Sequence, residues 1–187
     1  MNHTLLSLSA ALACATVLAL PAAHAATPEE ELVKAGYPQI NAAPPKPFGN
    51  YVNGHVSGKL LVVSSAAPQD VNGEFGPKDA WLKGRYGDDL TADARGVKVA
   101  ELACLRSLRF AKAVVGDLNR IRRVLRVSVA SLTTADFKDH TKVADGCSNL
   151  MTRVFGPEKG AHARVNLGVA SMPFGVAMEV TVEYEVE

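Results

Sequence analysis

Arginines are the most conspicuous chemical groups of this sequence, and four of them lie close together: Arg120, Arg122, Arg123 and Arg126. Such a cluster could contact RNA phosphates, but proteins that bind single strands also present aromatic side chains on which bases stack. No aromatic set accompanies this cluster, and we expect only Arg122 and Arg126 to share one face of a strand. The formal net charge of +1 gives no general attraction for polyanions. We therefore predict a solvated strand face and no nucleic-acid partner.

Other residue types that carry chemistry are scattered along the chain. The histidines show no metal-ligand spacing, and neither a Ser-His-Asp pattern nor a glycine-rich phosphate loop stands out. We predict no metal and no cofactor. Cys104 and Cys147 each fall on the apolar stripe of a separate expected helix, where a free thiol behaves as a small hydrophobe. Two buried thiols are therefore favoured, although the sequence leaves a disulfide open.

The N-terminus differs in composition from the rest. Residues 1–25 contain no Lys, Arg, Asp or Glu, and an apolar run from Leu5 to Leu20 is followed by an A-x-A cleavage pattern ending at Ala25. The run is too short to span a membrane comfortably. We predict a secretory signal peptide, a periplasmic or secreted protein, and no membrane partner after cleavage. A lipoprotein attached through Cys14 is less favoured, because the apolar stretch before that residue is very short.

The remaining 26–187 segment divides into elements that must position any site. We expect an N-terminal strap over 26–48 and a long loop over 66–89, which is rich in Gly, Pro, Asp and Asn. The other expected elements are strands at 51–55 and 59–65, a helix at 91–115, a strand at 121–132, a helix from 134 to 156, and two closing strands.

Apolar periodicity decides which face of each element is buried. The helix over 91–115 has an apolar stripe through Cys104, while Arg106 and Arg109 belong to its opposite, charged side. The last strand alternates valines with glutamates. The order β-β-α-β-α-β-β predicts an α+β domain over 49–187, with one sheet and two helices on one face. The uncovered face, with Val165 and Leu167, predicts self-association.

Several short motifs keep the order and spacing of a known family. They are Gly49-Asn50-Tyr51-Val52, Gly58-Lys59-Leu60-Leu61-Val62-Val63-Ser64, Gly87-Asp88-Asp89-Leu90-Thr91, Gly116-Asp117-Leu118, Asp145-Gly146-Cys147-Ser148, and the closing block from His162-Ala163-Arg164 through Met172-Pro173 to Glu179-Val180. This pattern resembles the RidA/YjgF family, also named the endoribonuclease L-PSP family, and its chorismate-mutase-like branch in particular. The resemblance runs from about Glu31 to Glu187.

The resemblance implies a fold, an assembly and a reaction. The fold would be chorismate-mutase-like, and the protein a homotrimer with three clefts between subunits. Members of the central branch of the family hydrolyse enamines and imines to 2-keto acids and ammonia without a cofactor. Arg164 would grip the carboxylate of the substrate, because a guanidinium matches it with two parallel hydrogen bonds. Glu179 would direct the attacking water. Each also has an ordinary alternative: a surface ion pair for Arg164 and a solvated strand position for Glu179.

Further residues are placed in the substrate site by the same resemblance. Tyr51 would be a cleft wall or else a core aromatic, and Asp145, where many relatives have Asn, would meet the ligand or brace its helix. Ser64-Ser65-Ala66 replaces the usual Ser-Gly-Gln, and Asn166 replaces a frequent Cys. These departures leave open a non-catalytic periplasmic protein that binds small carboxylates. RNA cleavage ranks last.

Overall fold

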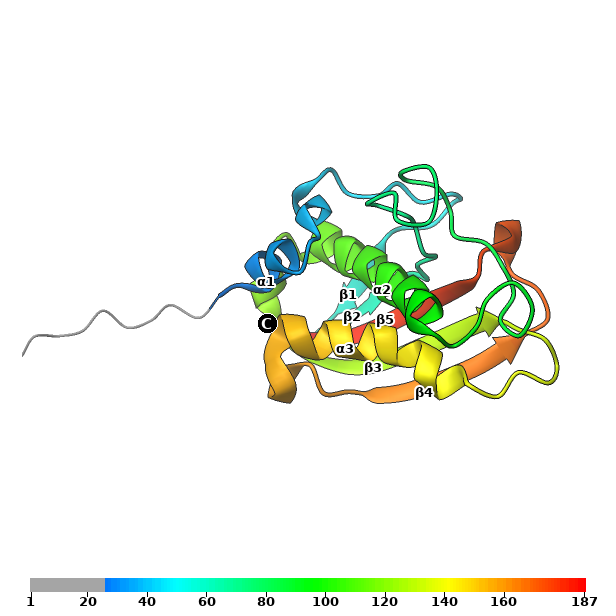
Figure 1. Cartoon of the computed structure of the whole chain (residues 1–187). Coiled ribbons are helices and arrows are strands. Elements are labelled where there is room, and N and C mark those ends of the chain that lie inside the picture. Colours follow the sequence, from blue (N-terminus) through cyan, green and yellow to red (C-terminus); the bar gives the residue numbers. More distant parts are fainter. Residues whose placement is uncertain (1–25) are drawn as a thin grey trace, which may run out of the picture.

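Five strands form one sheet, and two long helices cover one of its faces (Figure 1). The computed structural model describes residues 26–187, so the expected signal peptide lies outside the described residues. The strands are β1 (Gly54–Ser57), β2 (Leu60–Val63), β3 (Ile121–Leu132), β4 (Ala163–Val169) and β5 (Met178–Val186). Their order across the sheet is β1-β2-β5-β3-β4, with β3 and β4 parallel and the other pairs antiparallel. The predicted α+β sheet with two covering helices is confirmed.

The covering helices are α2 (Ala94–Val115) and α3 (His140–Lys159), while the short α1 (Pro28–Lys34) opens the described chain. Asp93 caps α2 by accepting a hydrogen bond from the Gly96 N–H. The second long helix was expected to begin near Thr134 but begins at His140. The reason is that Thr134 donates its N–H to the Tyr86 carbonyl of the long loop, so its backbone serves that contact.

The two helices touch at a glycine. A Cβ on Gly146 would lie 2.0 Å from the carbonyl oxygen of Val97, so only glycine allows α3 to approach α2 so closely. The next residue, Cys147, forms a disulfide with Cys104 of α2. The prediction of two free thiols is therefore wrong, because the close approach at Gly146 brings two buried sulfurs within bonding reach. No helix within 26–187 is long and apolar enough to cross a membrane.

The arginine cluster lies along the start of β3, beside the glutamates of β5. Two irregularities in the β3–β5 register place Arg123 opposite Glu185 and Arg126 opposite Glu183, and both form ion pairs there. Cross-strand partners share a face, so the expectation that only Arg122 and Arg126 do so is wrong. The cause is the pair of bulges, each of which adds a residue that shifts the alternation.

Candidate functional site

An aromatic cavity of about 360 Å³ opens between the strap, the long loop, α2 and the start of β5. Its walls are largely the rings of Phe48, Tyr51, Trp81, Phe110 and Phe174. Its polar lining includes Ser65, Arg106 and Glu179. The volume lies in the range of small-molecule sites, and a few polar groups among apolar walls are typical of them.

Glu179 stands at this cavity with an oriented carboxylate. The hydroxyl of Ser65 donates a hydrogen bond to Glu179 Oε2 at 2.7 Å. The chain places them together because Ala66 and Val180 form a two-way backbone bridge, with N···O distances of 2.8 and 3.0 Å. Ala66 and Val180 are both fully buried, so their neighbours project away from the core. Ser65 thus holds one oxygen of Glu179 in place and leaves the other free.

Tyr51 and Ser64 take different positions near the cavity. Tyr51 lines it, is 46% exposed, and accepts a hydrogen bond from the Phe48 N–H through its hydroxyl. It is therefore a wall of the cavity rather than a core aromatic. Ser64 is not among the lining residues; its hydroxyl donates to the Val52 carbonyl at 2.5 Å and ties the segment before β1 to the end of β2.

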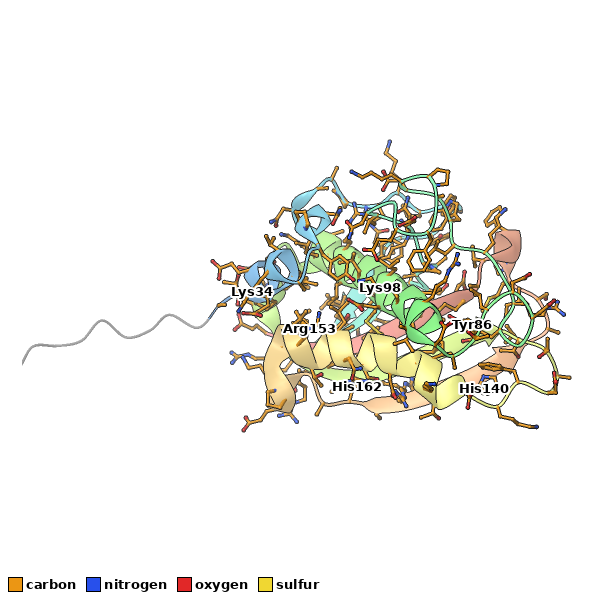
Figure 2. All side chains as sticks on the ribbon, in the orientation of Figure 1. Lys34, Tyr86, Lys98, His140, Arg153 and His162 are labelled. Atoms are coloured by element: carbon orange, nitrogen blue, oxygen red, sulfur yellow. A yellow bond between two sulfur atoms is a disulfide. The ribbon has the colours of Figure 1, made fainter. Side chains whose placement is uncertain are left out.

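Arg164 belongs to a second cluster, formed by β4 and α3. Its Nη1 donates to Asp145 Oδ1 at 2.6 Å and to Ser148 Oγ at 3.0 Å. Ser148 Oγ lies 2.9 Å from Nε2 of His162, whose Nδ1 lies 2.6 Å from the Gly160 carbonyl. His162 lies on the side of α3 that faces β4 (Figure 2). Because a carbonyl can only accept, Nδ1 carries a proton, and a neutral ring then accepts the Ser148 hydroxyl proton at Nε2.

This network holds the guanidinium of Arg164 by one nitrogen. Among the described residues, its other nitrogens form no hydrogen bond, and the side chain is 20% exposed. Asp145 both pairs with Arg164 and is half-exposed, so it orients the arginine and partly neutralises it. Asn166 follows two residues later on the same strand face, with its buried Oδ1 lacking a partner. Sequence reasoning placed Arg164 and Asp145 in the site but missed the supporting pair Ser148 and His162.

The two clusters lie on opposite faces of the sheet within one copy of the chain. Arg164 pairs with Val127, which is fully buried under the helices. Glu179 pairs with Ala130, whose side chain alternates to the uncovered face because its neighbour Val129 is buried. One copy therefore does not bring Arg164 and Glu179 together.

Arg106 is the cavity residue that sequence reasoning misassigned. It was expected on the charged side of its helix but is only 6% exposed, because the loop over 66–89 covers that side. Its Nη1 donates to Gln69 Oε1 at 3.0 Å, and its guanidinium carbon lies 4.7 Å from the Trp81 ring centre and 5.1 Å from that of Phe110. Burial, with a smaller contribution from Arg109, lowers the pKa of Arg106 to about 10. It stays protonated at neutral pH.

Side chains that could bind a metal ion do not cluster in the described part of the chain. Within 26–187, no group of three or more His, Cys, Asp or Glu side chains is arranged to hold a metal ion. The chemistry available at both clusters is hydrogen bonding, ion pairing and proton transfer by carboxylates.

Comparisons with known proteins agree with this fold. No family model matches the chain. Protein TCP17 of Trypanosoma cruzi is 38% identical over 135 residues, covering 72% of this chain and 79% of that protein. The crystal structure of Atu1372 from Agrobacterium tumefaciens, a protein of unknown function, is 33% identical, covers 86% of this chain and 94% of its own, and has a TM-score of 0.71. A Shewanella oneidensis structure, described as a candidate endoribonuclease, is 28% identical, covers 86% of this chain and all of its own, and has a TM-score of 0.75.

Proposed function

Because this chain belongs to the RidA/YjgF family, we propose that it hydrolyses small carboxylate-bearing imines and enamines in clefts between the subunits of a homotrimer. The products would be a 2-keto acid and ammonia. The observation that carries the proposal is the state of Arg164: Asp145 and Ser148 fix one nitrogen, and the rest of the guanidinium stays available at the sheet edge. A planar carboxylate can take two parallel hydrogen bonds from such a group.

Glu179 would supply the proton transfers. Water adds its oxygen to the electrophilic imine carbon while the carboxylate accepts a proton from it. The imine enters this step protonated, so the product is a neutral carbinolamine. The carboxyl returns its proton to the nitrogen, the C–N bond breaks with its electron pair on the departing ammonia, and the carboxylate takes the hydroxyl proton as the carbonyl of the keto acid forms. Ser65 supports this role because its hydrogen bond orients the carboxylate before the substrate arrives.

Assembly is needed to bring Arg164 of one copy to Glu179 of another. Support for it comes from β4, an edge strand that exposes Val165 and Leu167 by 42% and 58% on the uncovered face. An exposed edge and an apolar patch are features that proteins usually cover. We propose that neighbouring copies cover them in the homotrimer.

The test is an enzyme assay on the wild type and on two variants. Enzymatically generated 2-aminoacrylate is supplied, and keto-acid release is followed. Arg164→Ala should lower kcat/KM by roughly 10- to 100-fold, the value of a charge-assisted contact. Glu179→Gln should lower kcat by roughly 100- to 10,000-fold, as expected for a lost general base. Arg153→Ala, on the exposed side of α3, and Glu183→Gln, which stands beside Arg126, are the matched controls and should keep the wild-type rate.

Co-expression of Arg164→Ala with Glu179→Gln locates the site. If each cleft takes Arg164 from one copy and Glu179 from the next, random mixing restores about one intact cleft in four. Activity should return to that fraction. No recovery in mixed trimers would place the reaction within one copy and contradict the shared cleft. Wild-type rates for Arg164→Ala would remove the arginine from the mechanism altogether.

A second candidate is a non-catalytic protein that binds small carboxylates. It is favoured by the ion pair that Arg164 already makes with Asp145, and by Ala66, which is fully buried where relatives carry a polar glutamine. Tight binding of keto or amino acids without turnover would support it. RNA cleavage, suggested by the description of the Shewanella protein, ranks below both, since Arg122, Arg123 and Arg126 are paired with glutamates. RNA cleavage would have to produce fragments, and its rate would have to fall strongly as the salt concentration rises.

We further propose that the protein is exported. The disulfide between Cys104 and Cys147 supports this, because such bonds persist in oxidising compartments. Mass spectrometry of the exported protein should give a chain that begins at Ala26. A chain that keeps residues 1–25 in the exported fraction would contradict cleavage at that site.

A further inference from the structure

We propose that the aromatic cavity of each single copy binds an aromatic carboxylate, with Arg106 as the group that holds its anionic end. The proposal goes beyond the hydrolysis suggested above, since it requires neither Arg164 nor a second copy. Its principal residue, Arg106, lies on α2, whereas Tyr51 and Glu179 of the same cavity belong to the motifs that carry the family resemblance.

The first argument is the isolation of the Arg106 charge. Within residues 26–187, no carboxylate forms an ion pair with Arg106, and its one hydrogen bond goes to the neutral amide of Gln69. Arg106 as a whole residue is only 6% exposed, and a buried cation without an anion bears a substantial desolvation cost. Such a cost is offset when an anion binds. The neighbouring Arg109 adds repulsion rather than relief.

The second argument is that Arg106 still has free donors. It lines the cavity, and none of its nitrogens is both sealed from solvent and without a partner. A guanidinium has five N–H groups, so the bond to Gln69 leaves a fork that can meet a carboxylate. The rings of Trp81 and Phe110 lie within cation–π distance of the guanidinium.

The third argument is the composition of the walls. Phe48 packs edge-on against Trp81 with ring centres 5.1 Å apart, and Phe174 lies 5.7 Å from Phe48. Phe174 is 73% exposed and has a φ of 55°, a left-handed conformation that is costly for an aromatic residue. A large exposed ring held at such a cost at the mouth of a cavity fits the stacking of a planar ligand.

Charge and walls together define the ligand class. The anion must be small enough to enter a cavity of about 360 Å³ and must carry a flat apolar part for the rings. A phosphate alone would leave the rings unused, and a neutral aromatic would leave Arg106 without a counterion. A monocyclic aromatic carboxylate satisfies both.

The single tryptophan of the chain, Trp81, provides a direct assay. The purified protein is titrated with phenylacetate while Trp81 fluorescence is followed. Phenylacetamide has the same shape without the charge, and acetate has the charge without the ring. We expect a saturable change with phenylacetate and weaker binding of both other compounds by roughly 10-fold or more, because each lacks one of the two interactions.

Arg106→Met removes the charge and keeps an apolar chain of similar length. It should weaken phenylacetate binding by roughly 10- to 100-fold. It should also melt at the same temperature as the wild type or higher, because an uncompensated buried charge has been removed. The matched variant Arg109→Met lies one turn further along α2, outside the cavity, and should bind phenylacetate as the wild type does.

Two results would overturn the proposal. One is equal binding of phenylacetamide and phenylacetate, which would show that no cation holds the ligand. The other is an Arg106→Met protein that keeps full affinity or that melts markedly lower, as expected of a purely structural arginine. Either result can occur while Arg164→Ala still lowers kcat/KM of hydrolysis as expected, so failure here is distinguishable from failure of the proposed reaction.

Discussion

Reduction of the disulfide between Cys104 and Cys147 should strongly destabilise this protein. The bond joins residues 43 positions apart and links α2 to α3 across the core. A cross-link limits the conformations of the unfolded chain, and for a loop of this length its loss should cost about 4 kcal/mol of unfolding free energy. For a domain of this size, that corresponds to a fall in melting temperature of roughly 8–16 °C.

The assay compares urea unfolding of the oxidised protein and of the same protein kept reduced by a phosphine. This comparison leaves both sulfurs in the core, whereas Cys104→Ala with Cys147→Ala would also remove their packing. The double variant serves as a control: the reductant should leave its unfolding curve unchanged. The expected difference for the wild type lies in the denaturant midpoint and reports the loss of the cross-link alone.

The reasoning is refuted if reduction changes the unfolding free energy by less than about 1 kcal/mol, well below the loop-entropy value. It is also refuted if thiol titration of the unfolded, unreduced protein finds both Cys104 and Cys147 free. The second result would restore the interpretation of two buried thiols drawn from the sequence.

Three further outcomes are expected. Gly146→Ala should lower stability by about 1–3 kcal/mol because its Cβ would overlap a backbone carbonyl of α2, whereas Gly76→Ala, with open space around it, should melt as the wild type does. The backbone hydrogen bond that Asp93 accepts from Gly96 holds the pKa of Asp93 below the ordinary 3.8, so its contribution to folding stability is present above pH 3.8 and is lost as the pH falls further. Asp93→Asn should therefore reduce the fall in melting temperature on acidification. An unchanged fall would exclude the effect. Asp145→Asn should lower the KM of the proposed hydrolysis by up to about 5-fold by freeing the charge of Arg164, and a raised KM would show that Asp145 is needed to position it.

The spacing of apolar residues predicted most helices and strands, because this spacing decides which face of each element is buried. The alternation along β5 predicted its buried face, and every second residue from Met178 to Val186 is buried. The strand over 121–132 has the bounds that were expected. The start of the second long helix was missed because Thr134 is a good cap by type but is used in a contact with a distant loop.

The candidate site residues came only from motifs that could be matched. The structure places Tyr51, Ser65 and Glu179 at one cavity, and it pairs Arg164 with Asp145, a contact that the motifs did not predict. Arg106 was placed on a solvated face because a helical pattern does not show which loop will cover it. The disulfide was missed for a related reason: a glycine such as Gly146 signals close approach only after its neighbour is known.

The two clusters lie on opposite faces of the sheet, so the proposed ligand binding and the proposed hydrolysis differ in whether they need assembly. Glu179 and Arg106 line a cavity that one copy completes by itself. Arg164 faces the other way, under α3, so the proposed reaction needs Glu179 of another copy. A chain that folds but fails to associate would therefore retain the aromatic cavity and lose the proposed reaction, so the exposed apolar side chains of β4 matter for the chemistry as well as for burial.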